Sequence, residues 1–292
     1  MKKLLRYANL MALLAGGLGV LLLLWLRAKG PDQRGLYPGQ HPAWTILFLL
    51  TLALPVFFWL LSRAAGSNNT CHFNFPVSPL AALGYALAGS SMILAGMTAL
   101  GGTEPLDILA GISGILGGLL LLGGVYTRLT GRTLPVSIHA LPCIFFALEL
   151  FRMGQYLGSE PEMSRYLFSF LAVLSVLPAC YWLWSFDVDM GNRTKCLFWC
   201  LAAGYCNLVA TIGSESWLLH LGVALWMLTA LPRLQVPRRM RQAEEAQPEE
   251  PLPVPMPVEN VVAEVADHTP QMADVDAILD QIMKEYGSKA EE

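Results

Sequence analysis

The segment Leu134–Tyr156 reads LPVSIHALPCIFFALELFRMGQY, and the prediction of the fold starts from it. Its length and apolar composition suit a helix that crosses the hydrocarbon of a bilayer, which takes about 20 residues. The segment also contains His139, Glu149 and Arg152, whereas the other apolar segments have almost no charge in their interiors. We therefore expect a transmembrane helix here. Because ionisable residues inside a span are costly, this helix is also the first place to look for a site.

The composition extends this expectation to most of the chain. The protein has 292 residues, of which 54% are hydrophobic and 14% are charged, whereas about 25% of the residues in a soluble domain are charged. The 26 glycines and 12 methionines point the same way. We therefore predict an all-α fold in the form of a polytopic helical membrane bundle.

Eight apolar segments lie close to the length that a membrane span needs. They are residues 7–26, Trp44–Leu61, Pro79–Leu100, Leu106–Tyr126, Leu134–Tyr156, Tyr166–Phe186, Leu197–Ile212 and Trp217–Leu231. The prediction is therefore about eight transmembrane helices. The last two segments are the shortest and can also form a re-entrant pair, which leaves seven or six spans open.

Small residues recur four positions apart on three of these segments, and such stripes are typical of faces where membrane helices pack closely. The stripes are Ala8, Ala12 and Gly16, then Ala82, Ala86 and Ser90, then Ala110, Gly114 and Gly118. We expect the first, third and fourth segments to approach a neighbour through these faces.

The positive charges between the segments predict the topology, because cytoplasmic loops are enriched in Lys and Arg. With eight spans and a cytoplasmic N-terminus, the inner segments, among them a basic turn at Arg128–Thr133, hold 12 such residues and the outer loops hold 5. The first loop, with Arg27, Lys29 and Arg34, runs against this pattern. The alternation as a whole favours a multi-pass protein of the cell membrane with both termini in the cytoplasm.

The chain changes character near Pro232. Residues 1–232 have a net charge of +4 and residues 233–292 a net charge of −7, together the −3 of the whole chain. We therefore predict four parts: a transmembrane domain (1–232), a disordered linker (233–273), a short amphipathic helix (274–287) and a disordered end (288–292). The linker begins basic and becomes acidic and proline-rich, as expected of an extended cytoplasmic spacer.

The predicted helix after this spacer begins with Asp274–Tyr286, DVDAILDQIMKEY. Its apolar residues fall on one stripe: Val275, Ile278, Leu279, Ile282, Met283 and Tyr286. Its polar face is mostly acidic, so we expect the stripe to bind a cytoplasmic protein rather than the membrane surface. A stretch without a role stays the alternative, because a helix this short is marginal alone.

The candidates for a ligand-binding site are Glu149, Arg152, Asn207 and His220. Glu149 and Arg152 are three residues apart on one helix face, which favours an ion pair. In the predicted topology all four candidates lie in the outer half of the membrane, where they can line one cavity or bond separately to backbone and water. His139 lies about 15 Å from Glu149 along the helix, so we interpret it as a separate, satisfied histidine near the inner interface.

The sequence Gly111-Ile-Ser-Gly114 resembles the GxSG motif of rhomboid-type intramembrane serine proteases. The resemblance implies that Ser113 is the catalytic nucleophile and His220 its base. The other motifs of that family are missing here, and GxSG is a short pattern in a helix rich in glycine. The protease is therefore the remotest hypothesis.

The six cysteines include no CxxC pair, so the sequence predicts no zinc, haem or thioredoxin-type site. Cys196, Cys200 and Cys206 share one apolar segment and are expected to pack as small hydrophobic residues, with metal binding as a remote alternative. We expect no metal, no cofactor and no nucleic-acid partner, and we favour a protein without enzymatic activity.

Residues Leu141–Leu234 resemble a group of uncharacterised multi-pass proteins predicted in clostridial Firmicutes genomes. The resemblance rests on ALELFR (147–152), SEPEMSRYLFSFLAVLS (159–175), FDVDMGNRTKCLFW (186–199) and a Pro/Glu-rich tail that ends in a short helix. It covers about a third of the chain. It implies a bacterial inner-membrane protein and implies no activity.

Three functions follow, in decreasing order of support. The first is a non-enzymatic scaffold or regulator whose tail recruits a soluble partner to the bilayer. The second is a small-molecule transporter or lipid-binding membrane protein that uses the polar residues of the outer half, and the third is the protease. Polar residues that converge around a cavity would favour the second function, and scattered ones would favour the first.

Overall fold

The computed structural model describes residues 2–28, 41–65, 75, 77–131, 138–157, 163–188 and 190–231, and every regular element in them is a helix. The elements are α1 (Lys2–Leu5), α2 (Ala8–Ala28), α3 (Pro42–Ser62), η1 (Arg63–Ala65), α5 (Pro79–Ala99), α6 (Pro105–Thr130), α7 (Ala140–Leu157), α8 (Met163–Asp187), α9 (Arg193–Ala210) and α10 (Trp217–Thr229). The predicted all-α class is confirmed for these residues. The predicted linker and tail helix, residues 233–287, lie outside them.

Five helices are long and apolar enough to cross a membrane: α2, α3 together with η1, α5, α6, and α8 from Leu167 onward. Their outward faces carry large apolar side chains, as at Leu14 and Leu21 of α2, which are 65% and 63% exposed. Such faces suit contact with lipid tails, and a helix suits the hydrocarbon because it satisfies its own backbone groups. Helices α7, α9 and α10 are shorter or less apolar than these five and are not among the helices that meet this criterion.

Local sequence explains where several of these helices begin. Pro42, Pro79 and Pro105 each take the first helical position, where the missing N–H costs nothing. The Ser78 hydroxyl accepts a hydrogen bond from the Ala81 N–H at 3.3 Å and caps the start of α5. Gly131, with φ of 73°, ends α6 in the left-handed conformation that favours glycine.

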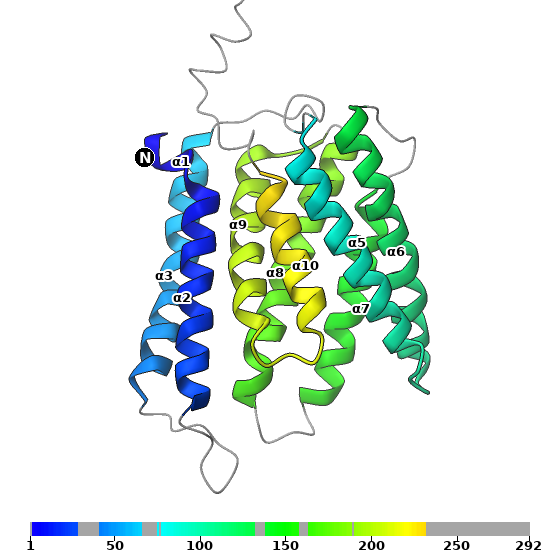
Figure 1. Ribbon diagram of the computed structural model, residues 1–292, viewed down its shortest axis with the longest axis horizontal. Coiled ribbons are helices and arrows are strands. Elements are labelled where there is room, and N and C mark those ends of the chain that lie inside the picture. Colours follow the sequence, from blue (N-terminus) through cyan, green and yellow to red (C-terminus); the bar gives the residue numbers. More distant parts are fainter. Residues whose placement is uncertain are drawn as a thin grey trace, which may run out of the picture. The chain divides into compact units, whose positions relative to one another are not determined.

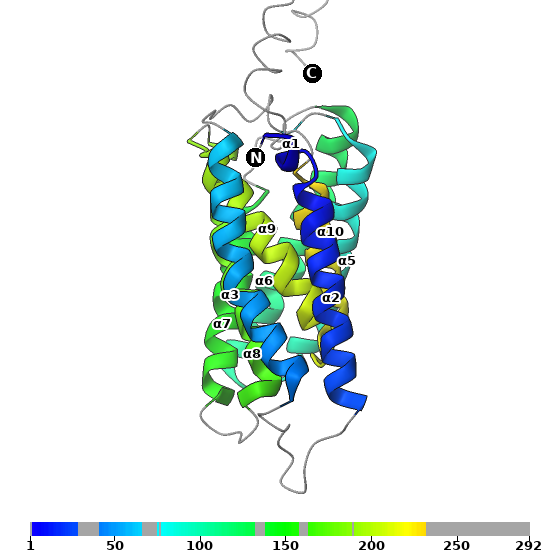
Figure 2. The same cartoon turned by 90° about the vertical axis from the view of Figure 1, so that its left-hand side faces the viewer.

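Six helices form a closed ring, in which α5, α6, α7, α8, α9 and α10 each pack against the next and α10 packs against α5 (Figure 1). Outside the ring, α2 and α3 pack against each other and against α9, as Figure 2 shows from that side. The short helix α10 is enclosed by α5, α9 and α2, and most of its side chains are buried. Its polar groups therefore face protein rather than lipid.

The closest helix pair in the ring is α5 and α6, and glycines make this approach possible. A Cβ atom on Gly118 would lie 2.6 Å from the carbonyl oxygen of Gly89, and one on Gly96 would lie 2.8 Å from that of Gly111. Real side chains do not tolerate such distances from backbone atoms. The two helices therefore pack backbone against backbone, as small-residue interfaces do in membranes.

The small-residue stripes were predicted correctly on two of the three segments. Ala8, Ala12 and Gly16 are buried on α2, and Ala110, Gly114 and Gly118 are buried on α6. The stripe predicted on α5 is confirmed only in part, because Ala82 is buried and Ala86 is partly buried, whereas Ser90 is exposed. The buried face of α5 instead includes Tyr85, Ala88, Gly89, Met92 and Gly96. In a helix this rich in Ala and Gly, small residues that are four positions apart occur on more than one face.

Candidate functional site

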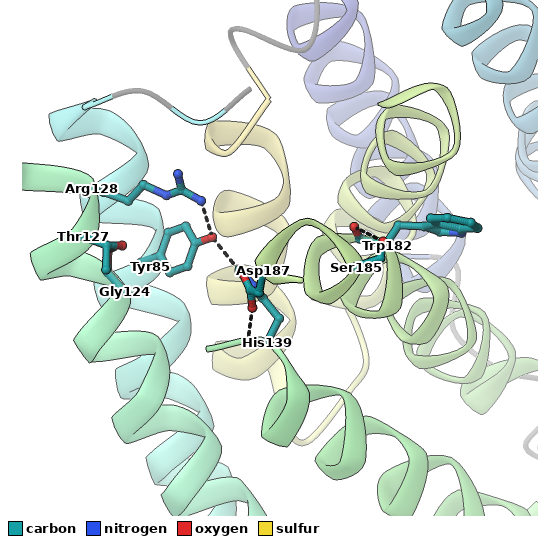
Figure 3. Close-up of polar contacts among 8 residues, drawn as sticks. All are labelled: Tyr85, Gly124, Thr127, Arg128, His139, Trp182, Ser185 and Asp187. Atoms are coloured by element: carbon teal, nitrogen blue, oxygen red, sulfur yellow. Dashed lines mark hydrogen bonds and ion pairs between the residues drawn. The ribbon is translucent and has the colours of Figure 1, made fainter. Parts of the chain in front are cut away.

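Four polar side chains at one end of the bundle form a continuous hydrogen-bond chain (Figure 3). Arg128 Nη2 donates to the Tyr85 hydroxyl at 3.0 Å, and that hydroxyl lies 2.8 Å from His139 Nε2. On the far side of the imidazole, His139 Nδ1 lies 2.8 Å from Asp187 Oδ2. We call these residues the Arg128–Asp187 chain. They join α5, α6, α8 and the turn before α7.

The chemistry of the groups limits the direction of each bond. A guanidinium can only donate, so the Tyr85 hydroxyl oxygen accepts from Arg128; a neutral His139 accepts the hydroxyl proton at Nε2, whereas a protonated His139 donates to the hydroxyl oxygen. His139 Nδ1 then carries the ring proton and donates it to the Asp187 carboxylate, which can only accept. The chain thus runs from a positive charge at Arg128 to a negative charge at Asp187.

Aromatic rings enclose this chain and remove it from solvent. The His139 ring stacks on Trp226 with centroids 6.0 Å apart, and Tyr85 meets Trp226 edge-on at 5.6 Å. The Arg128 guanidinium lies 4.6 Å from the centre of the Phe75 ring, and its Nη1 donates to the Phe75 carbonyl oxygen at 3.0 Å. The buried hydrogen bonds of this network tie together the helices that carry them, while Arg128 Nε has no partner among the described residues.

The Arg128–Asp187 chain was predicted only in part. His139 does have its own partners, as predicted. The predicted basic turn at Arg128 is wrong. Helix α6 continues to Thr130, and the Arg128 side chain is only 8% exposed. Tyr85 and Asp187 were not singled out. One feature of the sequence could have indicated the chain: Arg128, His139 and Asp187 all fall near the predicted inner ends of their segments.

A second polar cluster surrounds Arg152. Its Nη2 donates to Glu149 Oε1 at 2.8 Å, so the predicted ion pair is present. Its Nη1 also lies 3.5 Å from Asp107 Oδ1 in the first turn of α6, a partner that was not predicted. Glu149 and Asp107 are each 7% exposed. One guanidinium thus holds two largely buried carboxylates and ties α7 to α6.

Asn207 and His220 form a separate pair between α9 and α10. His220 Nδ1 donates to Asn207 Oδ1 at 2.9 Å, and Asn207 Nδ2 donates to the carbonyl oxygens of Ala203 and Ala172 at 2.9 and 3.4 Å. Both side chains are almost fully buried. The four ligand-binding candidates therefore lie in two groups, each with partners of its own, and no hydrogen bond links Glu149 or Arg152 to Asn207 or His220 among the described residues.

The geometry gives no support to the protease. The Ser113 hydroxyl donates to the Ala110 carbonyl oxygen at 3.0 Å within its own helix. The His220 imidazole bonds to Asn207. A serine nucleophile needs a base within hydrogen-bond reach, and these two residues have other partners.

The buried thiols pack as small side chains. Cys196 and Cys200 lie one turn apart on α9, with sulfur atoms 3.9 Å apart. Among the described residues no group of three or more His, Cys, Asp or Glu side chains is placed to hold a metal ion. Cys71 lies outside the described residues.

An apolar groove of about 450 Å³ lies between α3, α8 and α9, and the sequence did not predict it. Its lining comes from Trp44, Phe48, Thr51, Leu52 and Pro55 of α3, Leu167, Phe168, Leu171, Leu174 and Ser175 of α8, and Phe198, Trp199, Ala202 and Cys206 of α9. We call it the α3/α8/α9 groove. Its volume is within the range of about 300–1,000 Å³ that is typical of ligand pockets.

No protein-family model, curated protein or solved structure was found to match this chain. The resemblance to the clostridial membrane proteins therefore stays a prediction.

Proposed function

We propose that the chain is an eight-span membrane protein with both termini in the cytoplasm, and that it acts as a non-enzymatic scaffold or regulator. In this proposal the bundle anchors the protein in the bilayer. The amphipathic segment 274–287 recruits a soluble cytoplasmic protein through its apolar stripe.

The observation that carries the proposal is the scatter of the polar candidates. Glu149 and Arg152 bond to each other and to Asp107, whereas Asn207 and His220 bond to each other and to backbone. Each group joins neighbouring helices, which is the role of a polar contact that stabilises a bundle. A transport or catalytic site would instead bring such groups together around an accessible cavity.

The path of the chain supports an even number of crossings. Figure 1 shows α10 ending on the same side of the bundle as α1. The helices of the ring run up and down along the bundle. Helices α7 and α9 lie lengthwise beside the five strongly apolar helices. Eight crossings with both ends on one side follow if α9 and α10 each traverse the membrane.

The test uses the full-length protein, purified in detergent and exposed to the soluble fraction of its host cell. The stripe residue Ile278 is changed to Asp, and the matched control, Gln281→Asp, adds the same charge on the polar face of the predicted helix. A partner that binds the wild type and the control but is lost from Ile278→Asp supports the proposal. Identical retention by all three proteins, or by none, would remove the recruiting role.

The alternative, a transporter or lipid-binding protein that works through the outer-half polar residues, has a separate test. Glu149→Gln and His220→Ala would alter uptake or a bound lipid if those residues contacted a ligand. The hydrogen bonds of Glu149 with Arg152 and of His220 with Asn207 lead us to expect altered stability instead.

A further inference from the structure

We propose that the α3/α8/α9 groove holds one acyl chain of an anionic membrane phospholipid, with the phosphate of that lipid against Arg63 and Lys195. This site uses none of the polar candidates discussed above and is independent of the recruiting tail.

The wall offers an occupant almost no polar group. The two hydroxyls in the lining are already engaged: Thr51 Oγ1 donates to the Leu47 carbonyl oxygen at 2.8 Å and lies 2.9 Å from the Tyr205 hydroxyl. The Ser175 hydroxyl donates to the Ala172 carbonyl oxygen at 2.8 Å. The remaining lining is aliphatic and aromatic apart from the Cys206 thiol, so the groove suits hydrocarbon.

The groove is long enough for a stretch of extended hydrocarbon. It runs along α3 from Trp44 to Pro55, about 16 Å at 1.5 Å per residue. Two of the helices that line it, α3 and α8, are long and apolar enough to cross a membrane, so an acyl chain of a bilayer lipid is the occupant that the groove meets there.

The helix faces that line the groove continue to two cations at one end. On α9, Lys195 lies four residues before Trp199 and therefore shares its face. On α3, Trp59 follows Pro55 by four residues, and Arg63 follows Trp59 by four more, at the start of η1. Because η1 also contacts α9, the two charges belong to the same end of the groove.

Both cations are held in place and remain available. The Arg63 guanidinium lies 3.8 Å from the centre of the Trp59 ring, and Lys195 Nζ lies 4.6 Å from that of Trp182 on α8. Arg63 and Lys195 are exposed, and neither forms an ion pair with a carboxylate among the described residues. Tryptophan beside basic residues is the usual arrangement at a membrane interface, and basic pockets between helices bind anionic headgroups.

The test measures lipid binding by the purified full-length protein, with native mass spectrometry after removal of host lipid in a neutral detergent. The probes are dioleoyl phosphatidylglycerol and dioleoyl phosphatidylcholine, which share their acyl chains and differ in net charge. We expect one phosphatidylglycerol per protein, bound more tightly than phosphatidylcholine. Equal binding of the two lipids, or binding of neither, would overturn the proposal.

The first pair of variants replaces the exposed cations Arg63 and Lys195, because a change at an exposed residue does not disturb the core. Lys195→Gln and Arg63→Gln should each weaken phosphatidylglycerol binding about fivefold and leave phosphatidylcholine binding unchanged. The control Arg6→Gln removes an exposed positive charge between α1 and α2 and should have no effect. A loss as large in the control as in the two variants would show that the phosphate does not bind where we place it.

The second pair of variants tests whether the protein still binds lipid when a larger side chain fills the groove. Ala202→Leu introduces a branched side chain into the lining, whereas Ala53→Leu makes the same change on the exposed side of α3. Ala202→Leu should abolish the binding of both lipids at an unchanged helix content, and Ala53→Leu should bind them as the wild type does. Full lipid binding by a folded Ala202→Leu protein would contradict the proposal, and if that variant fails to fold the charge variants decide.

Discussion

The imidazole of His139 and the indole of Trp226 lie parallel, with ring centroids 6.0 Å apart and planes within 2° of each other. Trp226 belongs to the final turn of α10, which ends at Thr229. His139 is the centre of the Arg128–Asp187 chain, which joins α5, α6 and α8. The stack therefore fixes the last described helix to a polar network that three other helices share, and the integrity of this end of the bundle should depend on that network.

Removal of one hydroxyl from the network tests this dependence. We expect Tyr85→Phe to lower the free energy of unfolding by about 1–3 kcal/mol, because Arg128 Nη2 and His139 Nε2 then lose a partner in a buried site. The aromatic contact with Trp226 survives the change. Unfolding in mixed detergent micelles, followed by circular dichroism, measures the difference. Tyr126→Phe, at a tyrosine that is 47% exposed, is the control and should stay within about 0.5 kcal/mol of the wild type.

The contact between α5 and α6 predicts a strong effect of a single methyl group. Gly118→Ala places a Cβ where the Gly89 carbonyl oxygen lies 2.6 Å away, so the helices must separate, at a cost of about 1–3 kcal/mol. Gly17→Ala is the matched control, because a Cβ there meets nothing within 4 Å. The same unfolding experiment compares the two variants. Equal stability of both proteins would mean that the backbone contact contributes nothing.

The two carboxylates at Arg152 should differ in importance. Glu149 accepts its bond at 2.8 Å and Asp107 lies at 3.5 Å, so Glu149→Gln should lower the free energy of unfolding more than Asp107→Asn does, by about 1–3 kcal/mol for the closer partner. Glu104→Gln serves as control, since the exposed Glu104 side chain makes no capping bond. A larger loss from Asp107→Asn would reverse this order and point to Asp107 as the principal partner.

The parts of this structure that were predictable from sequence are those encoded within one helix. Apolar length identified the strongly apolar helices, and Pro79 marks the first residue of α5, where its segment was predicted to begin. The Glu149–Arg152 pair followed from a spacing of three residues on one helix face. These features need no knowledge of which helices are neighbours.

The features that were not predicted depend on neighbours. His139 and Asp187 are 48 residues apart, and Tyr85 and Arg128 are 43 apart, so their contacts require the order of helices around the ring. Periodicity identifies a face but not its partner, which is why Ser90, at the exposed end of the α5 stripe, was wrongly included in it. The α3/α8/α9 groove is harder still to predict, because it arises where α3 and α8 both pack on α9 and leave a space between them.

The number of spans depends on whether α9 and α10 both cross the membrane, and surface labelling can decide it. With 18 residues, α9 is about 27 Å long, close to the thickness of the hydrocarbon, and the enclosed α10 is about 20 Å long. We therefore expect a full crossing by α9, which puts Glu215 and Met190, both exposed, on opposite faces of the membrane. In a Cys71→Ser background, a membrane-impermeant maleimide should label Glu215→Cys in intact cells and Met190→Cys only after the membrane is opened. Labelling of both cysteines under the same condition would instead make α9 and α10 a re-entrant pair and reduce the count to six crossings.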